Sequence, residues 1–220
     1  MIVPMLQIVP LTEAEIDRQK ILNIDQYDLL IVVSPNAARQ LLHWLDVYWP
    51  QLPEHPRWIA VGAATAQALS RENVSAAIPR NAASSEGVLA LPMLQDVADQ
   101  KILLVKGEGG RTLLFDELSR RGARVAQLSL YRREPVRMNR DELMNRMGKV
   151  LPDVLIATSV ELLENLDASL SKLEERHRSI PLIVASERIQ SAAQALGYER
   201  IILATSAADD GILAALNVIG

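Results

Sequence analysis

The chain has 220 residues, of which 49% are hydrophobic and 23% charged, which is typical of a folded globular protein and excludes a disordered or collagen-like chain. The net charge of −4 and the 4% of aromatic residues argue against a protein that tracks nucleic-acid phosphates or stacks single-stranded bases. The lack of cysteine excludes disulfides, thiolate metal sites and cysteine nucleophiles, and the lack of a long apolar run argues against a membrane span, so we expect a cytoplasmic protein.

Short β-branched runs alternate with longer stretches of helical period along the whole chain. This alternation is typical of βα units around a largely parallel sheet, so we expect an α/β fold. Strands are expected at residues 29–33, 58–61, 101–105, 125–130, 154–157, 182–185 and 201–204, which are near-continuous apolar runs. Helices are expected at residues 36–48, 63–71, 85–94, 112–121, 160–175, 188–196 and 209–217.

Three consecutive βα units recur in the second half of the chain. The run DLLIVVS at 28–34 resembles DVLIATS at 153–159, an offset of 125 residues. The run from Pro56 resembles the run from Pro181 at the same offset, and SEGVLAL at 85–91 resembles DDGILAA at 209–215, one residue less. A shared offset over three units predicts two similar α/β domains.

The second copy is one βα unit shorter than the first. The first copy continues with a unit at 101–130, whose counterpart would lie beyond residue 220, and an apolar run at 1–9 resembles a strand with no unit before it. We therefore expect the missing unit to precede Met1. The prediction is a discontinuous domain of residues 1–8 and 138–220, a continuous domain of residues 9–130, and a return linker at 131–137.

Hydroxyl groups follow several of the expected strands. Ligands of parallel sheets bind beyond the carboxyl ends of the strands, and free N–H groups at the helix starts there favour anions. Ser34 and Thr65 occupy such places in the first copy, and Ser159 and Ser186, with Arg188 nearby, occupy them in the second. Helix capping is the alternative explanation for each hydroxyl.

The loop from Lys106 to Arg111 contains three glycines between two cationic side chains. Glycine lets the backbone approach a ligand, while the charges can pair with an anion. The loop lacks the Walker and G-x-G-x-x-G spacings, and a tight turn with solvated charges is the alternative. The three histidines have no partner at helical spacing, so no metal site is expected, and we interpret Asp209 and Asp210 as helix caps.

Several of these runs together resemble the uroporphyrinogen-III synthase family. They are VKGEGGRTLL and LYRREP within residues 101–135, VGAATAQAL at 61–69, VSP at 33–35, and, in the forms of proteobacterial members, SEGVLALPML at 85–94 and VASERIQSAAQALG at 184–197. The resemblance covers essentially all of the chain. Family members begin with a further strand and helix bearing a Thr-Arg-Pro-like turn, which is the unit that the repeat lacks.

The resemblance implies an enzyme of tetrapyrrole biosynthesis. Members convert linear hydroxymethylbilane to cyclic uroporphyrinogen III with loss of water, inverting ring D through a spiro intermediate. They use no cofactor or metal. Two flavodoxin-like domains joined by a two-stranded linker bind the substrate in the cleft between them, and we expect a monomer with no nucleic-acid or membrane partner.

The resemblance also assigns roles to single residues. Tyr131 matches the tyrosine proposed to assist departure of the hydroxyl, as a hydrogen-bond donor or general acid. Substrate-binding positions are Ser34, Thr65, Lys106, Gly107, Gly109, Arg111, Arg132, Ser159, Ser186 and Arg188. The four cations among them are expected to pair with several of the eight substrate carboxylates, while others stay in solvent. The alternative function is a non-catalytic two-domain protein that binds an anion or another small molecule. A regulator that has lost catalysis would be expected to carry a DNA-binding segment, and the sequence shows none.

Overall fold

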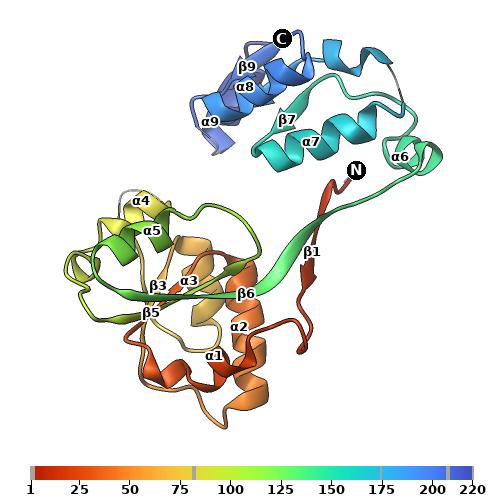
Figure 1. Cartoon of the computed structure of the whole chain (residues 1–220). Helices are drawn as coiled ribbons and strands as arrows, with labels where there is room; N and C mark the ends of the chain where they lie inside the picture. Colours follow the sequence, from red (N-terminus) through yellow and green to blue (C-terminus); the bar gives the residue numbers. More distant parts are fainter. Residues whose placement is uncertain (1–2, 81–82, 174, 207–208, 220) are drawn as a thin grey trace. The chain divides into compact units, whose positions relative to one another are not determined.

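The computed structural model describes residues 3–80, 83–173, 175–206 and 209–219, and its chain divides into two compact units (Figure 1). One unit is Ile8–Arg133, and the other combines Met1–Gln7 with Glu134–Gly220. Both contain parallel sheets with helices between the strands, so the predicted α/β class is confirmed.

A six-stranded sheet in the order β1-β6-β5-β2-β3-β4 forms the centre of the Ile8–Arg133 unit. Its strands are β1 (Leu6–Pro10), β2 (Leu29–Val32), β3 (Arg57–Ala60), β4 (Ala76–Ala77), β5 (Lys101–Gly107) and β6 (Arg124–Pro135). The strands from β2 to β6 pair in parallel. If β5 is counted as the first strand and β6, β2, β3 and β4 as the second to fifth, the order across the sheet is 2-1-3-4-5. This is a circular permutation of the flavodoxin order, and its switch point lies between β5 and β2.

The edge strand β1 runs antiparallel to the far half of β6. The N–H of Leu11 donates to the carbonyl of Leu130 at 3.0 Å, and the N–H of Val136 donates to that of Met5 at 3.1 Å. As the residue number rises on one strand it falls on the other, which is the antiparallel arrangement. The two segments that pass from one unit to the other are therefore hydrogen-bonded to each other.

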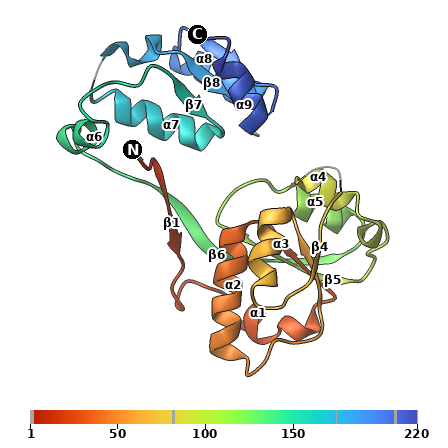
Figure 2. The same cartoon turned by 180° about the vertical axis from the view of Figure 1, so that it is seen from behind.

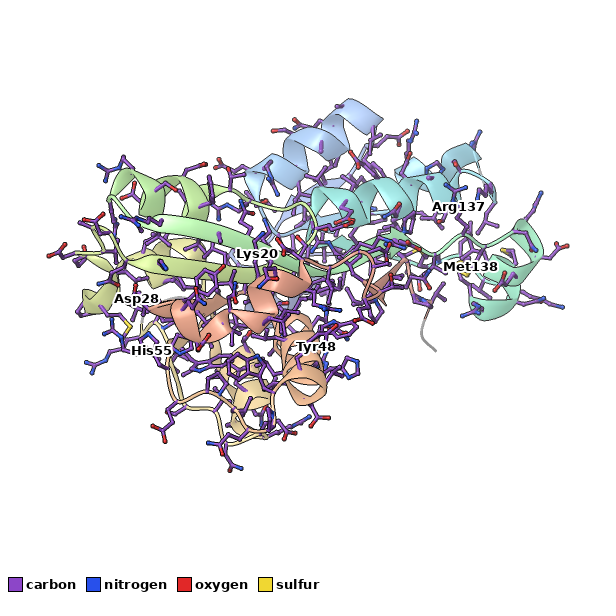
Figure 3. All side chains as sticks on the ribbon, turned by 60° about the horizontal axis from the view of Figure 1, so that its bottom comes forward. Lys20, Asp28, Tyr48, His55, Arg137 and Met138 are labelled. Atoms are coloured by element: carbon purple, nitrogen blue, oxygen red, sulfur yellow. The ribbon has the colours of Figure 1, made fainter. Side chains whose placement is uncertain are left out.

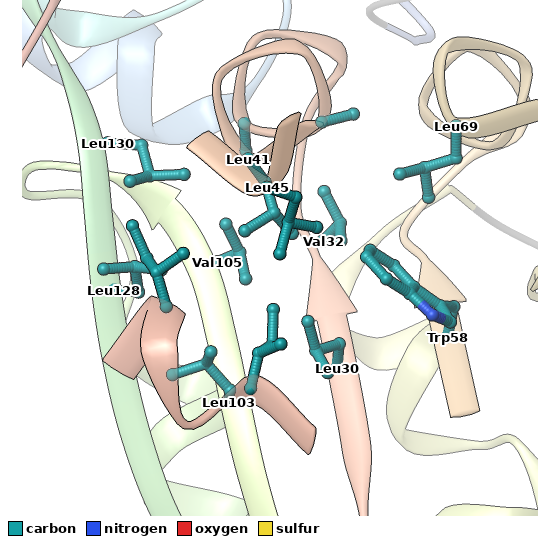
Figure 4. Packing of buried hydrophobic residues seen from close by; sticks show 14 of the residues in the cluster. Leu30, Val32, Leu41, Leu45, Trp58, Leu69, Leu103, Val105, Leu128 and Leu130 are labelled. Atoms are coloured by element: carbon teal, nitrogen blue, oxygen red, sulfur yellow. The ribbon is translucent and has the colours of Figure 1, made fainter. Parts of the chain in front are cut away.

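Helices cover both faces of the six-stranded sheet (Figure 2). The helices α1 (Arg18–Leu22), α2 (Pro35–Tyr48) and α3 (Ala63–Ser70) lie on one face, and α4 (Ser85–Leu89) and α5 (Leu113–Arg120) on the other. Successive strand residues point to opposite faces, so Leu30 packs on the α2 side and Leu29 on the α5 side. Figure 4 shows the first of these cores, where Val32 and Val105 lie close to Leu41 of α2.

Lys20 ties the short helix α1 to the sheet. Its Nζ donates to the carbonyl of Gln127 on β6 at 2.9 Å and pairs with Asp17 at 2.8 Å (Figure 3). After α1 the chain forms a single 3-10 turn, Ile24–Gln26, before it enters β2. This segment was not predicted from the sequence, because five helical residues give too short a pattern to recognise.

The other unit contains a three-stranded parallel sheet in the order β7-β8-β9. Its strands are β7 (Leu155–Ala157), β8 (Leu182–Val184) and β9 (Ile201–Leu203). The helices are α6 (Arg140–Arg146), α7 (Val160–Leu170), α8 (Glu187–Leu196) and α9 (Asp209–Leu216), with a 3-10 helix at Glu175–Ser179. Leucines of α7 pack on one face of the sheet, and Ala215 of α9 packs with Ile183 on the other.

The structure reproduces the internal repeat. The strands β2, β3 and β4 are parallel neighbours in this order, and β7, β8 and β9 are arranged in the same way. Ser34 caps α2 by accepting the N–H of Ala37, and Ser159 caps α7 by accepting that of Leu162, both at 3.1 Å. Both hydroxyls therefore cap a helix.

Some expected boundaries were wrong. The helix expected at 85–94 ends at Leu89, and a 3-10 turn starts at Pro92, because proline removes a helical N–H and clashes with the preceding turn. The helix expected at 160–175 ends at Leu170. The helix α4 is capped by Ser84, which accepts the N–H of Gly87 at 3.1 Å.

Candidate functional site

A pocket of about 370 Å³ lies at the carboxyl ends of β5 and β6 in the Ile8–Arg133 unit. Val33, which follows β2, and Val61, which follows β3, also line it. The pocket therefore opens at the switch point of the sheet, where parallel α/β folds bind ligands. Five residues expected to form a site line it: Lys106, Gly107, Gly109, Arg111 and Tyr131.

A larger cavity of about 580 Å³ lies between the C-terminal halves of α2 and α3. Both helices begin at the carboxyl ends of strands, so this cavity faces the opposite end of the sheet. Its walls mix apolar side chains such as Leu42 and Leu52 with both charge signs, from Arg71 to Glu72. We assign the site to the smaller pocket because the cations and the buried phenol meet there.

Tyr131 is placed by an irregularity in the pairing of β5 with β6. Lys106 is opposite Ser129, but Gly107 is opposite Tyr131, so β6 carries one extra residue at this point. The N–H of Glu108 then donates to the carbonyl of Tyr131 at 2.8 Å. The Tyr131 residue is only 4% exposed, so its position is fixed by packing.

Gly107 makes room for the ring of Tyr131. A Cβ atom at position 107 would lie 2.6 Å from both Cε2 and Cζ of the ring, a distance that real side chains do not reach. Glycine is required here by this contact and not by backbone freedom. By contrast, Gly109 and Gly110 have φ values of 65° and 82°, a left-handed backbone that favours glycine.

The hydroxyl of Tyr131 is hydrogen-bonded to Ser34, the residue that follows β2 across the switch point. The two oxygens are 3.0 Å apart, and either can be the donor. Ser34 thus contacts the phenol and caps α2 at the same time. Two residues that the sequence places 97 positions apart come together in this way.

Cationic side chains gather on the wall of the pocket near β6. Lys106 donates from Nζ to Oε1 of Gln127 at 3.3 Å, and both residues line the pocket with Arg133. Burial lowers the pKa of Lys106 from its ordinary value, and the positive charge of Arg133 lowers it further. An anionic ligand would relieve this repulsion, so these groups favour an anion.

Arg111 lies at the outer edge of the pocket and pairs with Glu86 of α4. The guanidinium Nη2 is 2.5 Å from Oε1 of Glu86, and both side chains are largely exposed. The backbone N–H of Glu86 and the Arg111 guanidinium lower the pKa of the Glu86 carboxyl. Arg111 would therefore have to break its ion pair with Glu86 in order to bind a ligand.

The structure pairs Arg132 with Glu15 and lines the pocket with Arg133. Nη1 of Arg132 is 2.6 Å from Oε1 of Glu15, a residue of the segment before α1. The pKa of Glu15 falls to about 2, through the backbone N–H of Thr12 first and then the Arg132 guanidinium. Neighbouring strand residues point to opposite faces, so Arg133 lines the pocket and Arg132 does not.

The other expected site residues lie elsewhere among the described residues. Thr65 is 3% exposed within α3 and is not part of the pocket wall. Ser159 and Ser186 stand at the carboxyl ends of β7 and β8, and Arg188 is exposed in the first turn of α8. These three belong to the unit that contains Glu134–Gly220.

Sequence reasoning missed several residues of the pocket wall, among them Gln127, Arg133, Leu114 and Phe115. Arg133 lies two residues after Tyr131 on β6, which is the spacing of one strand face, so accepting Tyr131 as a site residue was a sufficient signal to find it. Gln127 lies before the extra residue of β6, so a count back from Tyr131 does not place it. Leu114 and Phe115 belong to the amphipathic helix α5. Its apolar residues look the same in the sequence whether they line a pocket or pack in the core.

Replacing Gly107 with alanine is expected to lower catalytic activity roughly tenfold, because the ring of Tyr131 must move away from the new Cβ and misplaced reacting groups lose rate steeply. Overpacking also costs stability, on the order of 1–3 kcal/mol. Turnover and urea unfolding should be measured on the same preparation. Unchanged turnover in a folded variant would contradict a requirement for this ring position.

The part of the chain that the structure describes contains neither a candidate metal site nor a candidate membrane span. Within residues 3–80, 83–173, 175–206 and 209–219, no group of three or more histidine, aspartate or glutamate side chains could hold a metal ion. In the same part of the chain, every helix is too short or too polar to cross a membrane.

Comparison with known proteins gives one family. A family model described as uroporphyrinogen-III synthase HemD matches residues 1–214. The uroporphyrinogen-III synthase of Escherichia coli (strain K12) is 32% identical over 200 residues, which cover 88% of this chain and 80% of that protein. The enzyme of the same name from Salmonella typhimurium is 30% identical over 217 residues, covering 97% of this chain and 88% of that protein.

Solved structures agree in fold. The uroporphyrinogen-III synthetase of Helicobacter pylori 26695 superposes with a TM-score of 0.66 at 15% identity, covering 99% of this chain and 92% of that one. A mutant uroporphyrinogen III synthase from the extremely thermophilic bacterium Thermus thermophilus gives a TM-score of 0.62 at 19% identity, covering 98% and 88%. At these identities the likeness concerns the fold alone.

Proposed function

The chain belongs to the uroporphyrinogen-III synthase family, whose members are cyclising lyases, and we propose that its pocket at the β5–β2 switch point carries out this reaction. The substrate is hydroxymethylbilane, and the products are uroporphyrinogen III and water. The observation that supports this assignment is the buried phenol of Tyr131, held between Gly107 and Ser34 beside a wall of cations.

Tyr131 is the proposed catalytic residue. Its hydroxyl donates a hydrogen bond to the terminal hydroxyl of the substrate, whose C–O bond breaks as the oxygen leaves as water. The resulting azafulvenium is attacked by the substituted carbon of the last pyrrole to give the spiro intermediate. Fragmentation and closure at the free carbon of that ring then release one proton, which balances the proton taken by the leaving hydroxyl.

Most of the enzyme's task is to select one conformation of the substrate. Closure without an enzyme gives the symmetric isomer, so the protein must hold the last ring where inversion is faster than direct closure. Lys106 and Arg133 are proposed to bind a carboxylate of the substrate at the pocket wall. Ser159, Ser186 and Arg188 are proposed to bind further substrate groups at the strand ends of the other unit.

The same proposal extends to organisation and location. We propose that residues 9–130 and the combination of 1–8 with 138–220 are the two domains of the family, joined through residues 131–137. A cytoplasmic location and a monomeric state follow from the resemblance to the family. Their tests are fractionation of the source cells and sedimentation of the purified protein.

Replacing Lys106 with methionine is expected to raise the KM for hydroxymethylbilane about tenfold, because a substrate carboxylate loses its pairing with this partly buried cation. The KM of the variant should also depend less on ionic strength, since screening acts on that lost attraction. Lys101→Met is the matched control, at the exposed start of the same strand, and should keep the normal KM. A normal KM in the Lys106 variant would remove this lysine from substrate binding.

Turnover separates the proposed enzyme from the alternative binding protein. Hydroxymethylbilane is supplied to the protein, and the uroporphyrinogen isomers are separated after oxidation. We expect uroporphyrinogen III in excess. Uroporphyrinogen I alone, as in the absence of protein, would favour a non-catalytic protein with two α/β domains that binds an anion or small molecule.

A further inference from the structure

The Oγ atom of Ser34 takes part in two hydrogen bonds that point in different directions. It accepts the backbone N–H of Ala37 at 3.1 Å, and it lies 3.0 Å from the hydroxyl oxygen of Tyr131. The first bond uses one lone pair of the oxygen, and the hydroxyl proton remains for the second. A serine that only capped the helix would need no partner on β6.

The first of these bonds makes Ser34 a better donor toward Tyr131. Ala37 lies in the first turn of α2, a helix of 14 residues, where N–H groups carry the positive end of the helix dipole. A hydroxyl that accepts such a bond donates more strongly, because successive hydrogen bonds polarise one another. Donation from Ser34 to the Tyr131 oxygen leaves the phenolic proton of Tyr131 for the substrate.

We infer that Ser34 is a positioning residue that acts through Tyr131, in a relay from the N–H of Ala37 to Ser34, from Ser34 to Tyr131, and from Tyr131 to the leaving oxygen. The relay deepens the proposed function and rests on it. It gives Ser34 a different role from the substrate contact that the sequence suggests. Ser34 holds the hydroxyl end of the buried ring, while Gly107 gives the ring its space.

A double-mutant cycle tests the relay. Ser34→Ala in the otherwise unchanged enzyme is expected to lower kcat about tenfold, the worth of one hydrogen bond at a buried group, and to leave KM unchanged. In the Tyr131→Phe enzyme the same change should have no further effect on kcat, because the relay is already cut. Ser34→Thr keeps both hydrogen bonds and should restore most of kcat.

Two outcomes would overturn the relay. Equal losses from Ser34→Ala in both backgrounds would mean that Ser34 acts independently of Tyr131, and a higher KM at normal kcat would mean that it contacts the substrate. Asn139→Ala controls for the lost cap, since Asn139 caps α6 through the N–H of Glu142 at 2.9 Å, and it should keep full kcat. Failure of the proposed function itself has a separate signature, which is the absence of uroporphyrinogen III from the unaltered protein.

Discussion

Replacing Tyr131 with phenylalanine is expected to slow formation of uroporphyrinogen III by about 100-fold, the lower end of what a positioned acid or donor contributes. The ring stays in its packed place against Gly107, and the variant loses the oxygen that bonds Ser34. We expect this loss to exceed that of any single hydroxyl or cation in the pocket. Single-turnover measurement of the isomers would report it without interference from product release.

Tyr48→Phe is the matched control for this experiment. The Tyr48 hydroxyl, at the C-terminal end of α2, donates to Glu13 at 2.6 Å, so the control removes a hydrogen-bonded phenol oxygen that does not line the pocket (Figure 3). It should turn over at the normal rate. A normal rate in the Tyr131 variant would reject the donor role and leave selection of the substrate conformation as the whole of catalysis.

Replacing Asp167 with alanine is expected to cost about 3 kcal/mol of unfolding free energy, because breaking a buried charged network leaves its partners uncompensated. Asp167 is 7% exposed in α7 and accepts hydrogen bonds from Nε2 of His177 at 2.8 Å and from Nη2 of Arg178 at 2.9 Å. Arg178 remains in contact with water, so the loss stays at the lower end of the range for buried pairs. Asp153→Ala, at an exposed residue before β7, should change stability little in the same urea titration.

The same network predicts how stability depends on pH. Burial acts to raise the pKa of Asp167, but the hydrogen bonds from Arg178 and His177 outweigh it and hold this pKa below its ordinary value of 3.8. A carboxyl with a lowered pKa in the folded state stabilises that state above its ordinary pKa, and the contribution is lost as the pH falls below about 4. Asp167→Asn should flatten this part of the curve, and an unchanged acid limb would contradict the assignment.

The sequence predicted the central strands β2, β3, β5 and β8 well because both of their faces are buried. Residues such as Leu29 to Val32 are entirely apolar, and the apolar run ends at Val33, one residue after the strand ends. Short elements such as β4, with two residues, and α6, with seven, have no such signature. Their formation depends on neighbouring strands and helices, which no local pattern contains.

The sequence was sufficient to predict which loops form the candidate site, but not to which strand face each of its side chains points. The glycine loop and Tyr131 were identified, whereas the choice between Arg132 and Arg133 depends on which way one strand residue points. The extra residue in β6 lies before Tyr131, so the alternation from Tyr131 still selects Arg133, but no count along the strand places Gln127 in the pocket wall. Gly107 was predicted because glycine lets a ligand approach the backbone, whereas in the structure the ring of Tyr131 lies against it.

The two cap serines imply that folding alone can retain a residue that the proposed reaction also uses. Ser34 and Ser159 perform the same task at the same place of a duplicated unit, so a helix start suffices to retain either one. A descendant that had lost the reaction would therefore be expected to keep serine at position 34. Gly107 and Tyr131 cap no helix, so substitutions at these two positions would be expected to reveal the loss first.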